Sequence, residues 1–163
     1  MSPRAAWRLE SLGFGDIHDY MAGQADWLAF ALPVEGKQAG KPRAGGIARR
    51  DVPTCQITDR LSEVQAKLAA SEWESCIVVD EHSIVLGRIR GDAFDADPRK
   101  TAEEVMEPGP STVRPSEYLD ALVKRMKKPD VKTILVTTSI GELLGVLRRE
   151  DAEERLAEDQ KSA

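Results

Sequence analysis

The feature that most constrains the fold of this chain is an internal repeat. When the 163-residue sequence is shifted against itself by 58 residues, residues 54–92 align with residues 112–150 without a gap. Most apolar residues fall on apolar residues. The matched pairs include Leu61 with Leu119, Leu68 with Met126, and Gly87 with Gly145. A repeat of this length indicates two copies of one supersecondary unit, neither of which buries its apolar face alone.

The spacing of apolar residues changes in the same order within each copy. In the first copy, a short strand at 54–57 precedes Leu61, Val64 and Leu68, which have helical spacing with Asp59 as a plausible cap. Two apolar runs separated by a turn then predict a strand hairpin, and Gly91 and Asp92 open a short helix. The hairpin strands are expected at 76–79 and 84–89, with the turn at 81–83.

The second copy repeats this order, and a helical turn lies between the copies. We expect a strand at Thr112–Val113, a helix from about Glu117 to Lys128, a hairpin, and a final helix. The hairpin strands are predicted near Thr133–Thr137 and Glu142–Leu147. Thr101 and Glu104 have the spacing of a capping box, and Pro108 and Pro110 end the helical turn that it starts.

The composition excludes several classes of function. The chain has 23 Lys and Arg against 28 Asp and Glu, and a net charge of -5 gives no general attraction for nucleic acid. No apolar run is long enough to span a membrane, and no signal peptide is recognisable. The two cysteines, Cys55 and Cys76, coincide with apolar Val113 and Ile134 under the repeat, which indicates packing in a reducing cytoplasm. The sequence shows no catalytic set and no metal site.

The two copies together resemble a tandem pair of CBS domains, also called a Bateman module. The second copy carries the phrases VMEPGPSTVRP (105–115) and LLGVLRRED (143–151), and the first copy carries CIVVD (76–80) and VLGRIR (85–90) in matching places. The resemblance implies an α+β fold in which two strand-helix-hairpin-helix units pack sheet to sheet around a pseudo-twofold axis. It also implies two clefts that bind AMP, ADP, ATP or S-adenosylmethionine, and association into a homodimer.

The residues before the repeats differ in character. Residues 1–36 resemble the last strand and helix of a rhodanese domain, so we expect a short strand and helix extension without that family's catalytic cysteine loop. Residues 37–50 are rich in glycine and basic residues and are predicted to be a flexible linker. The predicted repeats are 51–104 and 105–157, with a tail at 158–163.

The resemblance also assigns candidate ligand-binding residues in the second copy. In nucleotide-binding CBS repeats, a Thr or Ser that ends the last strand meets phosphate, and an Asp three positions later binds the ribose hydroxyls. Here Arg148 replaces the hydroxyl residue and Asp151 is the acid. The alternative is a purely structural role, in which Arg148 is solvated and Asp151 only complements a helix dipole. The family's adenine slot corresponds to Thr112, Val113, Thr133, Ile134 and Leu135, each of which is also a plain strand or core position.

The first copy departs further from the family pattern. Arg90 stands at the hydroxyl position, Ala93 holds the place of the acid, and Asp92 is one position early. One residue at the start of a helix turns a side chain by about 100°, so Asp92 is not expected to substitute for the acid. We therefore expect the second copy to form the better nucleotide pocket.

Three functions follow from these residues. The first is a non-enzymatic regulatory module that binds an adenosine nucleotide or S-adenosylmethionine and needs no cofactor. The second is a ligand-free dimerisation or scaffold module, which Arg90, Ala93 and Arg148 favour. The third is a fragment of a rhodanese-type sulfurtransferase.

Overall fold

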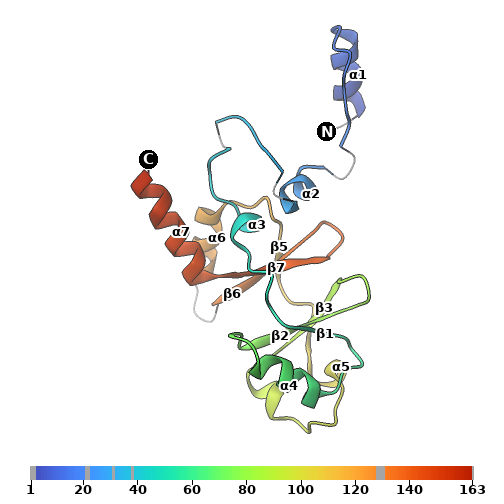
Figure 1. Cartoon of the computed structure of the whole chain (residues 1–163), viewed down its shortest axis with the longest axis vertical. Helices are drawn as coiled ribbons and strands as arrows, with labels where there is room; N and C mark the ends of the chain where they lie inside the picture. The colour runs from blue at the N-terminus through green and yellow to red at the C-terminus, as the bar shows by residue number, and fades with distance from the viewer. Residues whose placement is uncertain (1–2, 21–22, 31, 38, 128–130, 163) are drawn as a thin grey trace.

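A computed structural model provides the structure, and it describes residues 3–20, 23–30, 32–37, 39–127 and 131–162. Met21, Ala22 and Lys128, which take part in the sequence predictions, lie outside the described residues. Two small sheets lie one above the other in the body of the molecule, and helix α1 (Pro3–Ser11) projects from one end (Figure 1). The fold is mixed α and β, as predicted.

The first repeat contains the predicted elements in the predicted order. They are β1 (Thr54–Cys55), α4 (Leu61–Ala69), β2 (Ser75–Val79), β3 (Val85–Arg90) and the 3₁₀ helix η1 (Gly91–Asp95). Strand β1 is parallel to β2, and β2 is antiparallel to β3. The predicted helix cap is wrong by one position. Arg60 holds the cap position of α4 and its N–H donates to Glu63 at 3.2 Å, whereas Asp59 accepts from Lys67 Nζ at 2.9 Å.

The second repeat has the same order. It comprises β5 (Thr112–Val113), α6 (Leu119–Met126), β6 (Thr133–Thr137), β7 (Leu143–Arg148) and α7 (Arg149–Ser162). Its sheet has the order β5-β6-β7, with the same parallel and antiparallel pairings as the first repeat. The predicted strands and helices of both copies are therefore confirmed.

Each sheet is extended by a segment that precedes the other repeat in sequence. Helix α5 (Ala102–Val105) and strand β4 (Glu107–Pro108) pack on the first repeat, where β4 pairs with β3. Helix α3 (Ala44–Ile47) packs on the second repeat, where Arg49 pairs with Val146 of β7. The 58-residue shift places α3 on α5 and Arg49 on Glu107. The repeat therefore begins near residue 43, and the two copies exchange their leading segments.

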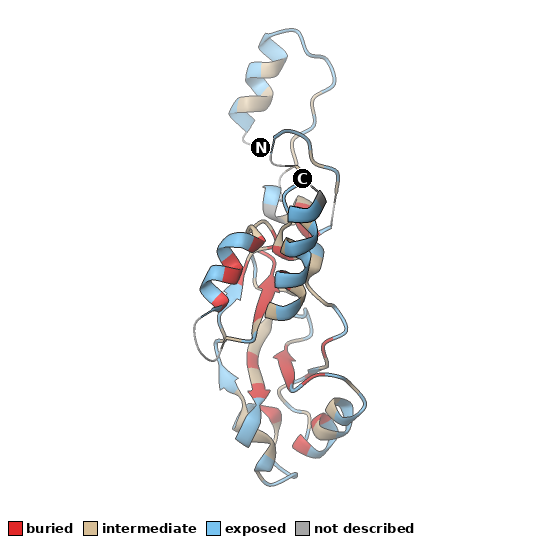
Figure 2. Cartoon of the chain, turned by 90° about the vertical axis from the view of Figure 1, so that its left-hand side faces the viewer, coloured by how far each residue is buried: buried red, intermediate tan, exposed pale blue. Residues whose placement is uncertain are grey.

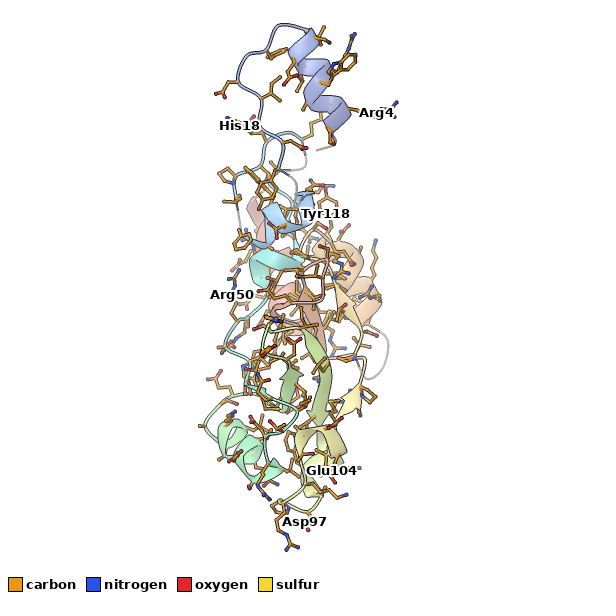
Figure 3. The ribbon with its side chains drawn as sticks, turned by 90° about the vertical axis from the view of Figure 1, so that its right-hand side faces the viewer. Arg4, His18, Arg50, Asp97, Glu104 and Tyr118 are labelled. Atoms are coloured by element: carbon orange, nitrogen blue, oxygen red, sulfur yellow. The ribbon has the colours of Figure 1, made fainter. Side chains whose placement is uncertain are left out.

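Because of this exchange, the prediction of a flexible linker at residues 37–50 is wrong for residues 43–50. Residues 43–50 are packed against the second repeat, because Ala44 is fully buried and the backbone N–H of Arg49 donates to the Val146 carbonyl at 2.9 Å. Arg43 stacks on the Tyr118 ring at 4.2 Å from its centroid and donates to the Tyr118 hydroxyl at 2.9 Å. Tyr118 lies close to this segment in Figure 3, whereas Glu104 of α5 lies at the opposite end of the molecule.

The predicted Thr101–Glu104 capping box is present, with the Thr101 N–H donating to Glu104 at 2.8 Å.

The two repeats pack against each other through one face of each sheet. Side chains alternate along β2, so that Cys76 and Val78 enter the core of the first repeat while Ile77 and Val79 face the second repeat. Leu135 of β6 is the equivalent of Ile77 under the 58-residue shift. It lies in the same apolar cluster, which the two repeats share. Figure 2 shows the buried residues concentrated in the strands and on the inner faces of their helices. Burial of this alternating face holds the repeats together.

The hairpin turns mark the pseudo-twofold axis. Ile84 forms a backbone bridge with Glu142, and these two residues are equivalent under the 58-residue shift. The Val85 N–H donates to the Gly141 carbonyl at 3.0 Å, and the Leu143 N–H donates to the Ser83 carbonyl at 2.9 Å. Two equivalent bonds in opposite directions are the pattern that a twofold axis produces.

The N-terminal extension differs from the predicted strand and helix. Residues 3–20 and 23–30 contain α1 and α2 (Gly23–Ala29) and no strand. The sequence of α1 explains the difference, because Pro3 occupies the first helical position and Ala, Arg, Leu and Glu favour a helix. The extension is attached through Arg50, which donates to the Ala29 carbonyl at 3.1 Å and is labelled in Figure 3.

Candidate functional site

A cleft of about 1500 Å³ lies where the strand ends of the two repeats meet. The first repeat contributes its lining from the start of β2 and the end of β3, and the second repeat from β5, the start of β6 and the start of α7. The connection from β4 to β5 passes along the cleft through Pro110 and Ser111. A ligand in this cleft contacts both repeats at once.

Six of the eight predicted site residues line this cleft. They are Arg90, Thr112, Thr133, Ile134, Leu135 and Arg148. Val113 does not line it, because its side chain points into the core of the second repeat and is 2% exposed. Alternation along β5 explains this difference, since neighbouring residues of a strand face opposite sides of the sheet.

Asp151 lies in the first turn of α7 and is not part of the cleft lining. Its carboxylate oxygen Oδ2 is buried and has no hydrogen-bond partner in the described part of the chain. The pKa of Arg49 is raised, first by its hydrogen bond to Asp51 and in small part by the charge of Asp151. A buried carboxylate oxygen that accepts no hydrogen bond destabilises the folded protein. A hydroxyl group that donated to it would remove this cost.

Arg148 connects the repeats and is only partly exposed to solvent. Its guanidinium stacks over the ring of Trp73 at 4.1 Å from the centroid and donates to the Glu72 carbonyl at 3.2 Å. Its side chain is 17% exposed, and Nη1 lies 3.8 Å from the Glu150 carboxylate. Arg49 lies 5.5 Å from the same Trp73 ring. Trp73, which is 6% exposed, therefore fills the space beside the strand end where the resemblance places a phosphate.

The equivalent strand end in the first repeat has a different environment. Arg90 Nε donates to the Glu107 carboxylate at 3.0 Å. Ala93 packs against the core of the first repeat, and Asp92 is exposed. The repeat equivalent of Trp73 is the much smaller Val131, which also lines the cleft. The two strand ends are therefore chemically unequal.

Sequence analysis did not single out Arg88, which the structure places in the wall of the cleft. Arg88 Nη2 donates to Ser75 Oγ at 3.0 Å and to Thr133 Oγ1 at 2.8 Å. Burial lowers the pKa of Arg88, and the neighbouring charge of Arg90 lowers it further. A signal was present in the sequence, because the 58-residue shift matches Arg88 with apolar Val146.

Comparisons with known proteins agree with this architecture. The CBS domain family model matches residues 102–158, and no curated protein sequence matches the chain. CBSX2, a CBS-pair protein from Arabidopsis thaliana, is 16% identical with a TM-score of 0.67, over 76% of this chain and 99% of that one. The fold is that of a CBS domain pair. The CBS pair fold accounts for both sheets, the pseudo-twofold axis and the cleft between the repeats.

Two further solved structures with the CBS pair fold contain adenosyl ligands. The cytosolic domain of the Mg²⁺ channel MgtE in complex with ATP is 22% identical with a TM-score of 0.63, over 72% of this chain and 50% of that one, so the chain spans half of that domain. A CBS domain pair in complex with 5′-methylthioadenosine and S-adenosyl-L-methionine is 21% identical with a TM-score of 0.61, over 72% of this chain and 98% of that one. A second structure of CBSX2 is a complex with AMP.

No helix within the described residues combines the length and the apolar character needed to cross a membrane.

Proposed function

We propose that this chain is a non-enzymatic regulatory module that binds an adenosyl ligand in the cleft between its two CBS repeats. The observation that carries the proposal is the cleft itself, because it brings Thr112, Thr133 and Leu135 together with the cationic Arg90 and Arg148. Apolar strand residues with backbone groups nearby suit an adenine ring, and guanidinium groups suit phosphate. The ATP, AMP and S-adenosylmethionine complexes of other CBS pairs support the same ligand class.

Asp151 and Arg148 are the proposed contacts to ribose and phosphate. Asp151 Oδ2 is buried outside the cleft lining and has no donor within the described residues, so a ribose hydroxyl reaches it only if the start of α7 moves. Stacking on Trp73 uses the face of the Arg148 guanidinium, but its in-plane donor Nη2 is bonded to the Glu72 carbonyl, so a phosphate that takes this donor competes with a contact between the repeats. The ligand thereby changes how the two repeats pack, which is the physical basis that we propose for regulation.

The test of this assignment is titration calorimetry with AMP and ATP on the wild type and two variants. Asp151→Ala is expected to weaken binding about 10- to 100-fold, because loss of a hydrogen bond to a charged group costs about 1.5–3 kcal/mol. Asp92→Ala is the matched control, since Asp92 is an exposed acid at the equivalent helix start and is expected to leave the affinity unchanged. Equal affinities for all three proteins would contradict the role of Asp151.

A ligand-free scaffold is the second candidate. The stacking of Arg148 on Trp73 and the ion pair of Arg90 with Glu107 occupy both strand-end cations without a ligand. Ala93 also leaves the first repeat without the acid of the family pattern. A wild-type protein that binds neither nucleotide nor S-adenosylmethionine at millimolar concentration would favour the scaffold.

We also propose that the chain forms a homodimer in the cytoplasm. Several large apolar side chains remain exposed on the single chain, namely Trp7, Leu12, Phe14, Phe30 and Ile140. Apolar surface of this kind favours association with a second copy. Both cysteines are free thiols, which suits a reducing compartment. Their burial in the first repeat leaves no exposed thiol for the sulfurtransferase alternative.

A further inference from the structure

At the position of Arg88, the first repeat carries a charge where the second repeat has an apolar residue. Under the 58-residue shift Arg88 corresponds to Val146, which is 1% exposed and packs in the cluster shared by the two sheets. Arg88 therefore places a guanidinium near the pseudo-twofold axis, where the other repeat has an apolar side chain. Its two acceptors, Ser75 Oγ and Thr133 Oγ1, are themselves equivalent residues of the two repeats.

The charge of Arg88 is not neutralised within the described residues. None of their carboxylates forms an ion pair with Arg88, and Arg88 Nε is buried without a hydrogen-bond partner. The acid that acts on it electrostatically is Glu107, which is paired with Arg90 at 3.0 Å. Arg90 is a like charge that opposes the protonated form of Arg88. A partly buried cation with unsatisfied donors is costly unless an anion completes the site.

The two hydroxyl groups complete the chemistry of the site. Each accepts a hydrogen bond from Arg88 Nη2, so its own proton remains free to donate toward the cleft. Ser75 is 3% exposed, and its position is fixed in β2. A guanidinium with two hydroxyl donors forms a convergent set of donors that matches the several acceptor oxygens of a phosphoryl group.

We propose that Arg88, Ser75 and Thr133 form a phosphate subsite on the axis of the cleft, distinct from the strand-end position of Arg148. This inference rests on the proposed function and narrows it, because the ligand must carry at least one phosphoryl group. The alternative is that Arg88 only links the two repeats by bonding to both hydroxyls. A neutral donor would be enough for that link, so it does not explain a buried positive charge. The subsite accounts for this positive charge.

The test is titration calorimetry on the whole chain with adenosine, AMP, ATP and inorganic pyrophosphate. The wild type is expected to bind ATP at least about 10-fold more tightly than adenosine. Arg88→Met should weaken ATP binding about 10- to 100-fold and leave adenosine binding unchanged, whereas Arg88→Lys should retain part of the preference for ATP because it keeps the charge. Arg114→Met is the matched control, because Arg114 also donates to a threonine hydroxyl, Thr137 Oγ1 at 2.9 Å, but does not line this cleft.

The outcomes separate this inference from the proposed function. If adenosine and ATP bind equally and Arg88→Met changes neither, the subsite is refuted while an adenosyl module stands. If pyrophosphate binds, adenosine does not, and Arg88→Met abolishes the binding, the subsite stands and the adenosyl assignment fails. If no probe binds to the folded wild type, both are overturned. Thermal unfolding of Arg88→Met establishes that its loss of binding is not a loss of folding.

Discussion

Replacement of Gly145 by alanine is expected to release the N-terminal segment from the second repeat. Gly145 lies in β7 with φ at +156°, a backbone conformation that residues with a Cβ rarely adopt. An added Cβ would lie 2.5 Å from the carbonyl oxygen of Arg49 and 3.0 Å from its carbonyl carbon. Both contacts are with backbone, so no side-chain rotation relieves them.

The magnitude follows from the bonds at this point. The Arg49 N–H donates to the Val146 carbonyl at 2.9 Å, and the Val146 N–H donates to the Arg49 carbonyl at 2.8 Å. The loss of two backbone hydrogen bonds costs about 1–3 kcal/mol, and strain at the substituted residue adds about 1–3 kcal/mol. We expect Gly145→Ala to lower the free energy of unfolding by about 3 kcal/mol, which corresponds to a fall in Tm of about 6–12 °C for a chain of this size.

Urea and thermal unfolding of three variants test this reasoning. Gly46→Ala is the control, because Gly46 lies in α3 with no atom near its added Cβ, and alanine there should be neutral or stabilising by up to about 1 kcal/mol. Gly87→Ala, the repeat equivalent, should cost less than Gly145→Ala because its nearest contact is the flexible end of Met106. A Gly145→Ala variant within about 0.5 kcal/mol of the wild type would refute the tight contact between β7 and the Arg49 backbone.

Two further predictions concern assembly and acid stability. Light scattering at tens of micromolar should give the mass of a dimer, and a monomer would count against the exposed apolar residues as an interface. The hydrogen bonds from Arg49 lower the pKa of Asp51 from its ordinary 3.8 to about 2, so their contribution to stability is present above pH 4 and is lost as the pH falls through 2. Arg49→Met should return this pKa toward 3.8 in an NMR titration of the carboxyl group, and an unchanged pKa would refute the assignment.

The repeat and the alternation of apolar residues made most of the fold predictable from the sequence. The 58-residue shift located the strands and helices of both copies, because equivalent residues such as Ile77 and Leu135 have equivalent packing. The exchanged segments were not predicted, since residues 43–50 contain glycines and charged residues and lack apolar periodicity. Their order comes from long-range contacts with Tyr118 and Val146, which local patterns do not encode.

The candidate site was predictable in part. Six of its residues follow from the family resemblance, because the position of a residue at a strand end fixes which side of the sheet it faces. The stacking of Arg148 on Trp73 was not predictable, since it joins residues of different repeats. The role of Arg88 depends on two hydroxyls brought together across the axis, and only the packing of the two sheets reveals it.

Because the leading segments are exchanged, the residues that form one repeat in the sequence are not the residues that pack together as one sheet and its helices. Residues 101–108 precede the second repeat but extend the sheet of the first, and residues 43–50 do the reverse. A single copy therefore has an open sheet edge and a leading segment with no sheet to join. Two separate copies can satisfy both needs only by domain swapping. The tandem chain is thus a domain-swapped dimer in covalent form, in which damage to either half exposes an edge of the other.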